Sequence, residues 1–455
     1  MKKTLPALLL VAAVLVGGYF STRDVLAQAT RVSARNQIDF LAFYCAGKVS
    51  AARADPYLAE PLRSCEETAM ASLGPKFKMA PYLVVPAPLP PYVLALFAPF
   101  GLASYRVAAT LWFALLLGAC ALTVILLRRL SGLPLLVLFV PVLLADALAS
   151  ILIGQIVPVV LCFVCAAALA LRDGKPLAAA GYAVATLLEA HVGLPLCLAL
   201  FVWQPQTRRG IVLFGGALGL LSLAYGGIAQ HVEYLTRVVP AQARAEGLSF
   251  SGQYSLSALL AQTGVEPGLA LQLGSLSYVV MLVVGIVLAG RLARSLHDPA
   301  FVAVVPPALV LLGGAYAHIH QMAFALPLAF MLVARRSAWR PLALAALLLL
   351  AIPWQSFAEM PFFYTRLPPL PRVDIRPAMS RIAEGDRLAE DEWGLWQSLP
   401  IRDRRTPLQR LETKLPTWLG LLALTIAAFG IAAGGAQNES SEERSRANLR
   451  SITRA

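Results

Sequence analysis

Long apolar runs recur along almost the entire chain, and this feature limits the possible folds more than any other. A helix needs about 20 apolar residues to cross a bilayer. Of the 455 residues, 58% are hydrophobic and only 14% are charged, whereas soluble domains are about 25% charged. The sequence therefore predicts an all-α integral membrane protein, a polytopic helical bundle with about 12 transmembrane helices. The predicted spans are residues 5–22, 106–127, 133–150, 152–171, 177–190, 192–203, 211–229, 273–290, 300–316, 318–334, 341–357 and 416–434.

Two apolar regions depart from this simple pattern. Glu189, His191 and Pro195 interrupt residues 177–203, so we expect either two short helices or one broken helix there. Residues 86–103 contain five prolines, and proline removes a backbone donor from a regular helix. We expect this segment to be re-entrant or interfacial, because irregular backbone at membrane depth is tolerated only where protein or a cavity covers it.

Basic residues orient the predicted spans. With the N-terminal lysines inside, the segments on that side carry 17 Lys or Arg, whereas the short loops on the other side carry only Arg237 and Arg244. Cytoplasmic loops are enriched in Lys and Arg, so the sequence predicts a bacterial inner-membrane protein with both termini in the cytoplasm. The chain has a net charge of +13, but its basic residues lie in pairs between apolar runs. A nucleic-acid-binding protein would gather them in a patch, so no nucleic-acid partner is expected.

These boundaries divide the chain into four parts. Residues 1–357 form a membrane module that includes a first periplasmic loop at 23–105. A second long periplasmic loop covers 358–415, the last span covers 416–436, and residues 437–455 form a polar cytoplasmic tail that we expect to be disordered. The first apolar run is expected to remain as a span, the alternative being a signal peptide cleaved near residues 27–29.

Several polar side chains fall at the extracytoplasmic ends of the predicted spans. Ionisable residues at membrane depth are costly and are functional candidates. The group consists of Asp39, Asp146, Gln155, Glu189, His191, His231, His318 and His320. Their gathering on one side predicts a single site that faces the periplasm.

Each of these residues has a functional and a structural interpretation. Asp39 lies beside apolar residues and suits a general base, or it caps a short helix. Gln155 can bond a sugar hydroxyl, or it can join two helices. Glu189 and His191 can pair, or can hold a phosphate when the histidine is protonated; the structural interpretation is an ion pair that locks the helix break.

Two further residue pairs raise the question of crosslinks and metals. Cys45 and Cys65 lie in the first loop and are candidates for a disulfide in an oxidising compartment. His318 and His320 invite a metal interpretation. On a helix, however, residues i and i+2 do not face each other, and no third ligand with clear spacing is visible. We therefore expect no metal cofactor and assign these histidines to an anionic or sugar ligand.

Five motifs occur in a fixed order along the chain. They are Asp39-Phe40 with Tyr44, Asp55-Pro56-Tyr57, Pro90-Pro91 to Pro99 ahead of Leu111-Trp112, Gly154-Gln155, and His318-Ile319-His320 with Leu326-Pro327. No soluble nucleotide-sugar signature such as Asp-x-Asp accompanies them. In this order they resemble the GT-C class of multi-span glycosyltransferases that use lipid-linked sugars, and most of all glycosyltransferase family 87. The resemblance covers roughly residues 5–357.

The resemblance implies a GT-C-like bundle that transfers a mannose-like sugar from a polyprenyl-phosphate donor to a lipid or glycan acceptor, with inversion. It implies that Asp39 is the catalytic base. It also implies substrate or donor contacts for a larger set of side chains, namely Tyr44, Tyr57, Gln155, Glu189, His191, His318 and His320.

One departure separates this chain from the family pattern. Where the family shows Lys-Pro in its middle, this chain has Glu189 and His191, with Pro195 later. The alternatives are a ligase or polymerase of surface polysaccharide and a transporter of lipid-linked sugars. A transporter favours internal repeats and charges at the midplane, which the sequence does not show.

Overall fold

The computed structural model describes residues 37–74, 84–245, 247–248, 252–352, 354 and 413–434. The predicted first span, most of the second long loop and the C-terminal tail lie outside these residues. Within them the chain is helical, with one isolated β-bridge between Gln253 and His318.

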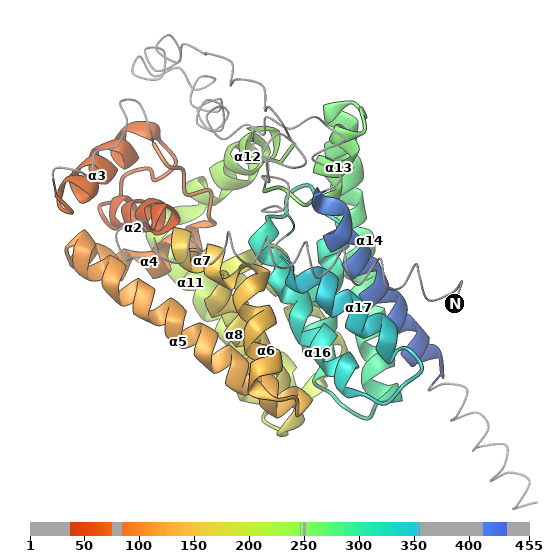
Figure 1. The fold of residues 1–455 in the computed structure, drawn as a ribbon. Coiled ribbons are helices and arrows are strands. Elements are labelled where there is room, and N and C mark those ends of the chain that lie inside the picture. The colour runs from red at the N-terminus through yellow and green to blue at the C-terminus, as the bar shows by residue number, and fades with distance from the viewer. Residues whose placement is uncertain are drawn as a thin grey trace, which may run out of the picture.

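The helices are labelled in chain order in Figure 1. Those before the middle of the chain are α2 (Ile38–Ala51), α3 (Ala59–Ala71), α4 (Pro91–Phe97), α5 (Tyr105–Ser131), α6 (Leu135–Val142), α7 (Leu148–Ile153), α8 (Val157–Arg172), α9 (Pro176–Ala185), α10 (Ala190–Trp203) and α11 (Arg208–Glu233). Those after it are α12 (Val239–Ala245), α13 (Leu256–Gln262), α14 (Pro267–Ser295), α15 (Phe301–Leu309), α16 (Leu326–Ala334) and α17 (Arg340–Ala351), and a final helix covers Thr413–Gly434.

Length and apolar surface make this a membrane protein. Among the described residues, five helical stretches have the length and apolar composition of a membrane span: Tyr105–Ser131, Pro176–Trp203, Pro205–Ala243, Pro267–Ser295 and Thr413–Gly434. The second of these, however, is not straight, as described below. Large apolar side chains on them face outward, as at Leu220 and Ile228, which are 71% and 74% exposed. Such surfaces suit lipid better than water. The all-α membrane class is therefore confirmed, whereas the number of about 12 spans stays a prediction.

The stretch Pro176–Trp203 doubles back as a helical hairpin. The thiol of Cys197 on α10 donates to the carbonyl oxygen of Ala183 on α9 at 3.3 Å. A Cβ atom at Gly193 would lie 2.5 Å from the carbonyl carbon of Thr186, so the two arms touch at a position where only glycine fits. The tip is the 3₁₀ turn Thr186–Glu189. Of the two predicted alternatives, the structure therefore has two short helices, which lie antiparallel.

Prolines and glycines explain where other predicted spans break. The predicted helix at 133–150 contains Pro141 and widens into a π turn at Leu143–Ala147. The predicted helix at 300–316 ends at Leu312, ahead of Gly314 with φ of 102°. In the proline-rich segment, α4 and the 3₁₀ turn Ala98–Leu102 together make only about 20 Å of helix, shorter than a bilayer of about 30 Å. This length agrees with the prediction that the segment does not span.

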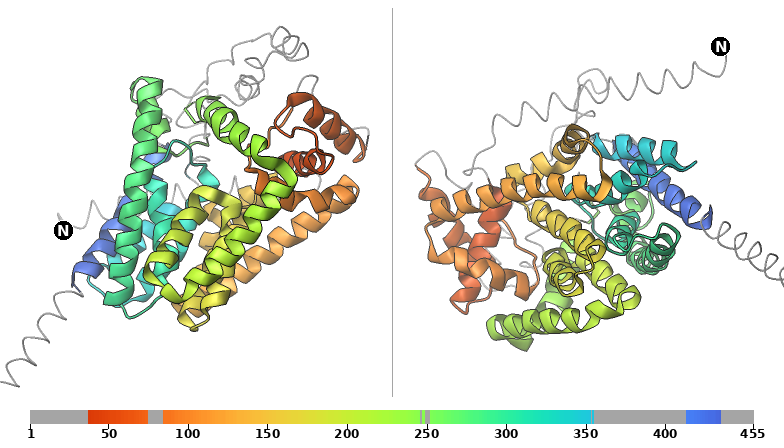
Figure 2. Two further views of the ribbon diagram at one scale, coloured as in Figure 1. Left: turned by 180° about the vertical axis from the view of Figure 1, so that it is seen from behind. Right: turned by 90° about the horizontal axis from the view of Figure 1, so that it is seen from below.

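The bundle has two different ends (Figures 1 and 2). We call the end that carries α2, α3, α4, α12 and α13 the site end. At the opposite end α5 and α8 finish and the basic residues gather. In the connections 128–134, 172–176, 203–209, 291–299 and 335–340 there are eleven Lys or Arg and two Asp. This asymmetry agrees with the charge pattern that oriented the predicted spans.

Candidate active site

An aromatic cluster fixes the helix that carries Asp39. The next residue, Phe40, is fully buried, and its ring stacks on that of Trp112 with 5.4 Å between centroids. The ring of Phe100 meets Phe40 edge to face. Stacked and edge-to-face pairs of this kind stabilise one ring orientation. The start of α2 is therefore held at one position, and Asp39 with it.

Asp39 and Gln155 lie in contact although 116 positions separate them. The side-chain nitrogen Nε2 of Gln155 donates to Oδ2 of Asp39 at 2.6 Å. The interpretation of Asp39 as a helix cap is wrong, because α2 begins at Ile38 with Gln37 in the cap position. Gln155 joins two segments of the bundle, as its structural interpretation proposed, and its partner is the candidate base itself.

Gly154 makes this contact possible. Its φ is 81°, a conformation that side chains with a Cβ rarely adopt. A Cβ atom here would lie 2.7 Å from that of Phe40. The indole nitrogen of Trp112 donates to the carbonyl oxygen of Gly154 at 2.9 Å. The Gly-Gln pair thus works as a unit, in which the glycine allows close approach and the glutamine reaches the carboxylate.

The tip of the α9–α10 hairpin carries a second polar group. Nδ1 of His191 lies 3.4 Å from Oε2 of Glu189, and Nε2 of Gln321 donates to the same oxygen at 3.2 Å. In turn, Oε1 of Gln321 accepts from the backbone nitrogen of His318 at 2.8 Å. Gln321 therefore links the hairpin tip to the predicted histidine pair.

The histidine pair is arranged differently from the prediction. His318 is in extended conformation just before the 3₁₀ turn Ile319–Ala325. For this reason the helical rule for residues i and i+2 does not apply, and the rings of His318 and His320 stack at 4.9 Å. Tyr316 and Gln253 bond the ring of His318. In the described part of the chain, no three His, Cys, Asp or Glu side chains group as metal ligands.

The two predicted tyrosines bond backbone carbonyls near the proline-rich segment. The hydroxyl of Tyr44 donates to Ala103 at 2.9 Å, and that of Tyr57 donates to Leu89 at 2.7 Å. Burial raises the pKa of the Tyr57 hydroxyl far above its usual range, so this group stays neutral and acts as a donor. Both tyrosines thus fasten the start of the first loop to the two ends of the proline-rich segment.

Cys45 on α2 and Cys65 on α3 form a disulfide. Together with the tyrosine contacts, this bond ties the two loop helices to each other and to the bundle. The helix that presents Asp39 is therefore braced from several sides.

Two groups of side chains thus form at the site end, and α8 is linked to both. One group is Asp39 with Gln155, directly ahead of α8. The other joins the hairpin tip to the histidine pair, and α8 packs against both Thr186–Glu189 and Ile319–Ala325. Sequence reasoning missed Gln321 and Gln253. Gln321 carried a usable signal, since it is a polar residue beside His320 in an otherwise apolar run.

Comparison with known proteins gives one match. The family model of glycosyltransferase family 87 matches residues 89–312. The matched part includes Gln155, Glu189 and His191, while Asp39 and the histidine pair lie outside it. No curated protein and no solved structure matches the chain. On this match, and on the apolar helices described above, the chain belongs to glycosyltransferase family 87 and is a membrane-embedded glycosyltransferase.

Proposed function

We propose that the protein transfers a mannose-like sugar from a polyprenyl-phosphate donor to a lipid or glycan acceptor at the extracytoplasmic face of a bacterial inner membrane. The contact between Asp39 and Gln155 carries this proposal. It places a partly exposed carboxylate at the site end and holds it with an amide donor at 2.6 Å. A positioned carboxylate of this kind is suited to remove a proton from a hydroxyl.

In this reaction Asp39 is the base. Its carboxylate takes the proton of the acceptor hydroxyl while that oxygen forms a bond to the anomeric carbon. The bond between this carbon and the phosphate oxygen breaks at the same time, and the electron pair leaves with the polyprenyl phosphate. Attack opposite the leaving group inverts the configuration. The amide of Gln155 keeps the carboxylate oriented, and such positioning accounts for a large part of the rate in many enzymes.

The hairpin tip and the histidine pair supply the groups that meet the leaving phosphate. His191 is the central residue, because its Nε2 is buried and has no hydrogen-bond partner among the described residues. Hydrogen-bond donors fixed where charge develops stabilise a departing anion. Glu189 and Gln321 orient this region in place of the Lys-Pro of the family pattern. In this scheme the side chains, and no metal ion, receive the phosphate.

The position of the site agrees with the nature of the donor. A polyprenyl-phosphate sugar is held by its lipid tail at the boundary of the bilayer. The candidate residues lie at one end of a bundle whose opposite end is strongly basic, and a basic end is typical of the cytoplasmic side. We therefore assign the site end to the periplasm.

The test compares Asp39→Asn with Glu67→Gln. Both changes remove one carboxylate at the site end, but Glu67 is exposed on α3. Each purified full-length protein is reconstituted with radiolabelled polyprenyl-phosphate sugars and a membrane glycolipid extract as acceptor. Asp39→Asn is expected to lower the transfer rate by at least about a hundredfold, in the range usual for loss of a general base, while Glu67→Gln keeps the wild-type rate.

Full turnover by correctly folded Asp39→Asn would refute the base assignment. If wild-type protein instead used no lipid-linked sugar but accepted nucleotide sugars, the donor class would be wrong while the family assignment would stand.

A further inference from the structure

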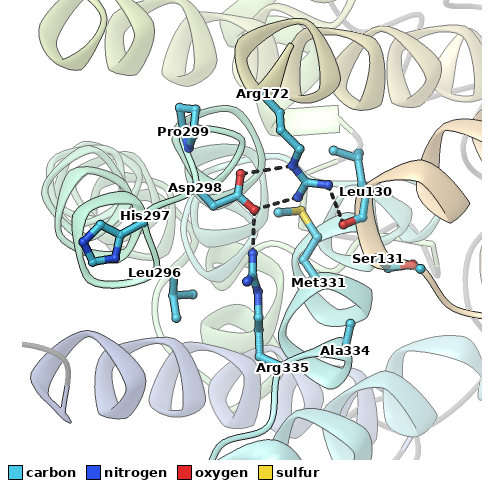
Figure 3. Close-up of a pocket in the computed structure, with 11 residues that line it drawn as sticks. Leu130, Ser131, Arg172, Leu296, His297, Asp298, Pro299, Met331, Ala334 and Arg335 are labelled. Carbon is cyan, nitrogen blue, oxygen red and sulfur yellow. Dashed lines mark hydrogen bonds and ion pairs between the residues drawn. The ribbon is translucent and has the colours of Figure 1, made fainter. Parts of the chain in front are cut away.

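A cavity of about 490 Å³ lies at the basic end of the bundle, at the ends of α5 and α8 and opposite the site end. Figure 3 shows the residues that line it. It is open on one side, and its volume falls in the range of about 300–1,000 Å³ usual for small-ligand sites. The ends of α5, α8, α14 and α16 surround it. The side chains with charge or hydrogen-bonding groups that line it include Ser131, Arg172, His297, Asp298 and Arg335.

Two arginines from different helices meet one carboxylate in this cavity. Arg172 binds Asp298 through Nε at 3.2 Å and through Nη2 at 2.6 Å. Arg335 reaches the same carboxylate through Nη2 at 2.7 Å. Asp298 also accepts from the backbone nitrogen of Ala300 at 3.1 Å, and its side chain is only 6% exposed. One carboxylate between two guanidinium groups leaves a net positive charge on the cavity wall.

The two arginines differ in how many of their N–H donors remain available for a ligand. Arg172 also donates through Nη1 to the carbonyl oxygens of Leu130 and Arg129, so most of its donors are engaged. A guanidinium has five N–H donors. Among the described residues, Arg335 uses only one of its two Nη2 hydrogens, on Asp298. Its side chain is 38% exposed, which leaves it able to bind an anion in the open cavity.

The arrangement of N–H donors and positive charge in the cavity favours a phosphate group over a monatomic anion. Arginine binds phosphate oxygens through two parallel N–H donors. The surrounding connections carry the excess of Lys and Arg described above, so an anion is also attracted from a distance. Basic pockets between helices at this level of a membrane protein suit phosphorylated lipid headgroups.

We propose that this cavity is a binding site for a phosphate-bearing anion, with Arg335 as its main ligand and Arg172 and Asp298 as the frame that holds it. The same chemistry is offered by the headgroup of an anionic phospholipid and by a soluble phosphate. The site is separate from the transfer reaction proposed above and does not depend on it.

The experiment measures bound lipid on the full-length protein by native mass spectrometry. Wild-type protein is taken from nanodiscs that contain equal parts of phosphatidylglycerol and phosphatidylcholine. The two variants are Arg335→Gln and Arg336→Gln. They remove the same charge at neighbouring positions, but Arg336 is exposed and does not line the cavity. Arg335→Gln should fold, because Arg172 still pairs with Asp298.

Wild type and Arg336→Gln are expected to retain phosphatidylglycerol in preference to phosphatidylcholine, and Arg335→Gln to lose about tenfold in this retention, as for a charge-assisted pair. If wild type shows no lipid preference but binds inorganic phosphate at millimolar concentration, the ligand is a soluble phosphate. Equal retention of both lipids by wild type together with no binding of phosphate would overturn the proposal. Equal losses in the two variants would also overturn it, since the effect would then come from general surface charge.

If Arg335→Gln proves unstable, Arg335→Lys takes its place with the same expected loss, because lysine keeps the charge but not the paired donors.

Discussion

At the scale of single residues, Glu66 is the most deeply buried carboxylate outside the spans in the described part of the chain. It lies on α3 next to the disulfide-bonded Cys65 and is fully buried. Its Oε2 accepts from the backbone nitrogen of Val85 at 3.0 Å, while its Oε1 has no partner among the described residues. Burial raises the pKa of Glu66 from 4.5 to about 8. The folded loop therefore holds this carboxyl protonated at neutral pH.

This environment predicts a pH-dependent stability. Unfolded protein releases the Glu66 proton above about pH 4.5, whereas folded protein keeps it up to about pH 8. The stabilisation of the folded state by the retained Glu66 proton is therefore fully present below pH 4.5 and is lost as pH rises to 8. The loss is at most about 1.4 kcal/mol per pH unit. Glu66→Gln should unfold at a higher temperature than wild type at pH 8, with a smaller difference at pH 5. Thermal unfolding at both values measures this. Glu67→Gln is the control, and a pH-independent difference for Glu66→Gln would contradict the prediction.

The identity of the candidate residues could be predicted from sequence, but their partners could not. Asp39, Gln155 and His318 stand out because a polar group in an apolar run is costly. The contact between Asp39 and Gln155 crosses 116 positions, and no local pattern encodes which of several polar residues will meet. Gln321 was missed for the same reason, since its role depends on the hairpin tip opposite it.

At the scale of elements, the α9–α10 hairpin depends on a single close approach. The arms touch where Gly193 faces the backbone of Thr186, and that backbone cannot move aside as a flexible side chain could. Sequence showed the interruption by Glu189 and Pro195. It could not show the direction of the chain beyond it, because a kink and a full reversal leave the same apolar pattern.

Adding a methyl group at Gly193 should separate the arms. Overpacking of this kind costs about 1–3 kcal/mol, and here it also moves Glu189 and His191. Gly193→Ala is expected to lower both the melting temperature and the transfer rate. Gly219→Ala on α11 is the matched control, because nothing lies within 4 Å of the added Cβ there. Thermal unfolding and the radiolabel assay check both variants, and wild-type behaviour of Gly193→Ala would show that the hairpin is packed differently.

At the scale of the whole molecule, the charge asymmetry between the two ends is the feature that sequence predicted best. It needs only the order of apolar runs and basic pairs. The number of spans was harder to predict, because several helices are shorter than a bilayer and lie packed between others. Val157–Arg172 has only 16 residues, most of them buried. Composition alone does not separate such a helix from one that crosses lipid.

The assigned orientation can be tested by cysteine labelling. Single cysteines replace Glu67 at the site end and Arg336 at the basic end, both exposed, after Cys120, Cys162, Cys165 and Cys197 have been changed to alanine. A membrane-impermeant maleimide should label position 67 in intact cells, and position 336 only after permeabilisation. The reverse result would place the candidate site in the cytoplasm.

The reversal at Glu189 also has a consequence for how the chain enters the membrane. The α10 arm has 14 residues, about 21 Å of helix, and α9 is shorter, so neither arm can act as a stop or start signal of its own in a bilayer of about 30 Å. Both must enter as one unit. The tip already meets α8, which is synthesised earlier, but Glu189 gains its bond to Gln321 and the carbonyl of His191 its bond to Tyr278 only when those later segments have arrived. The hydrogen bonds at that tip are therefore completed late in assembly, and an early release of the nascent protein would leave Glu189 without Gln321.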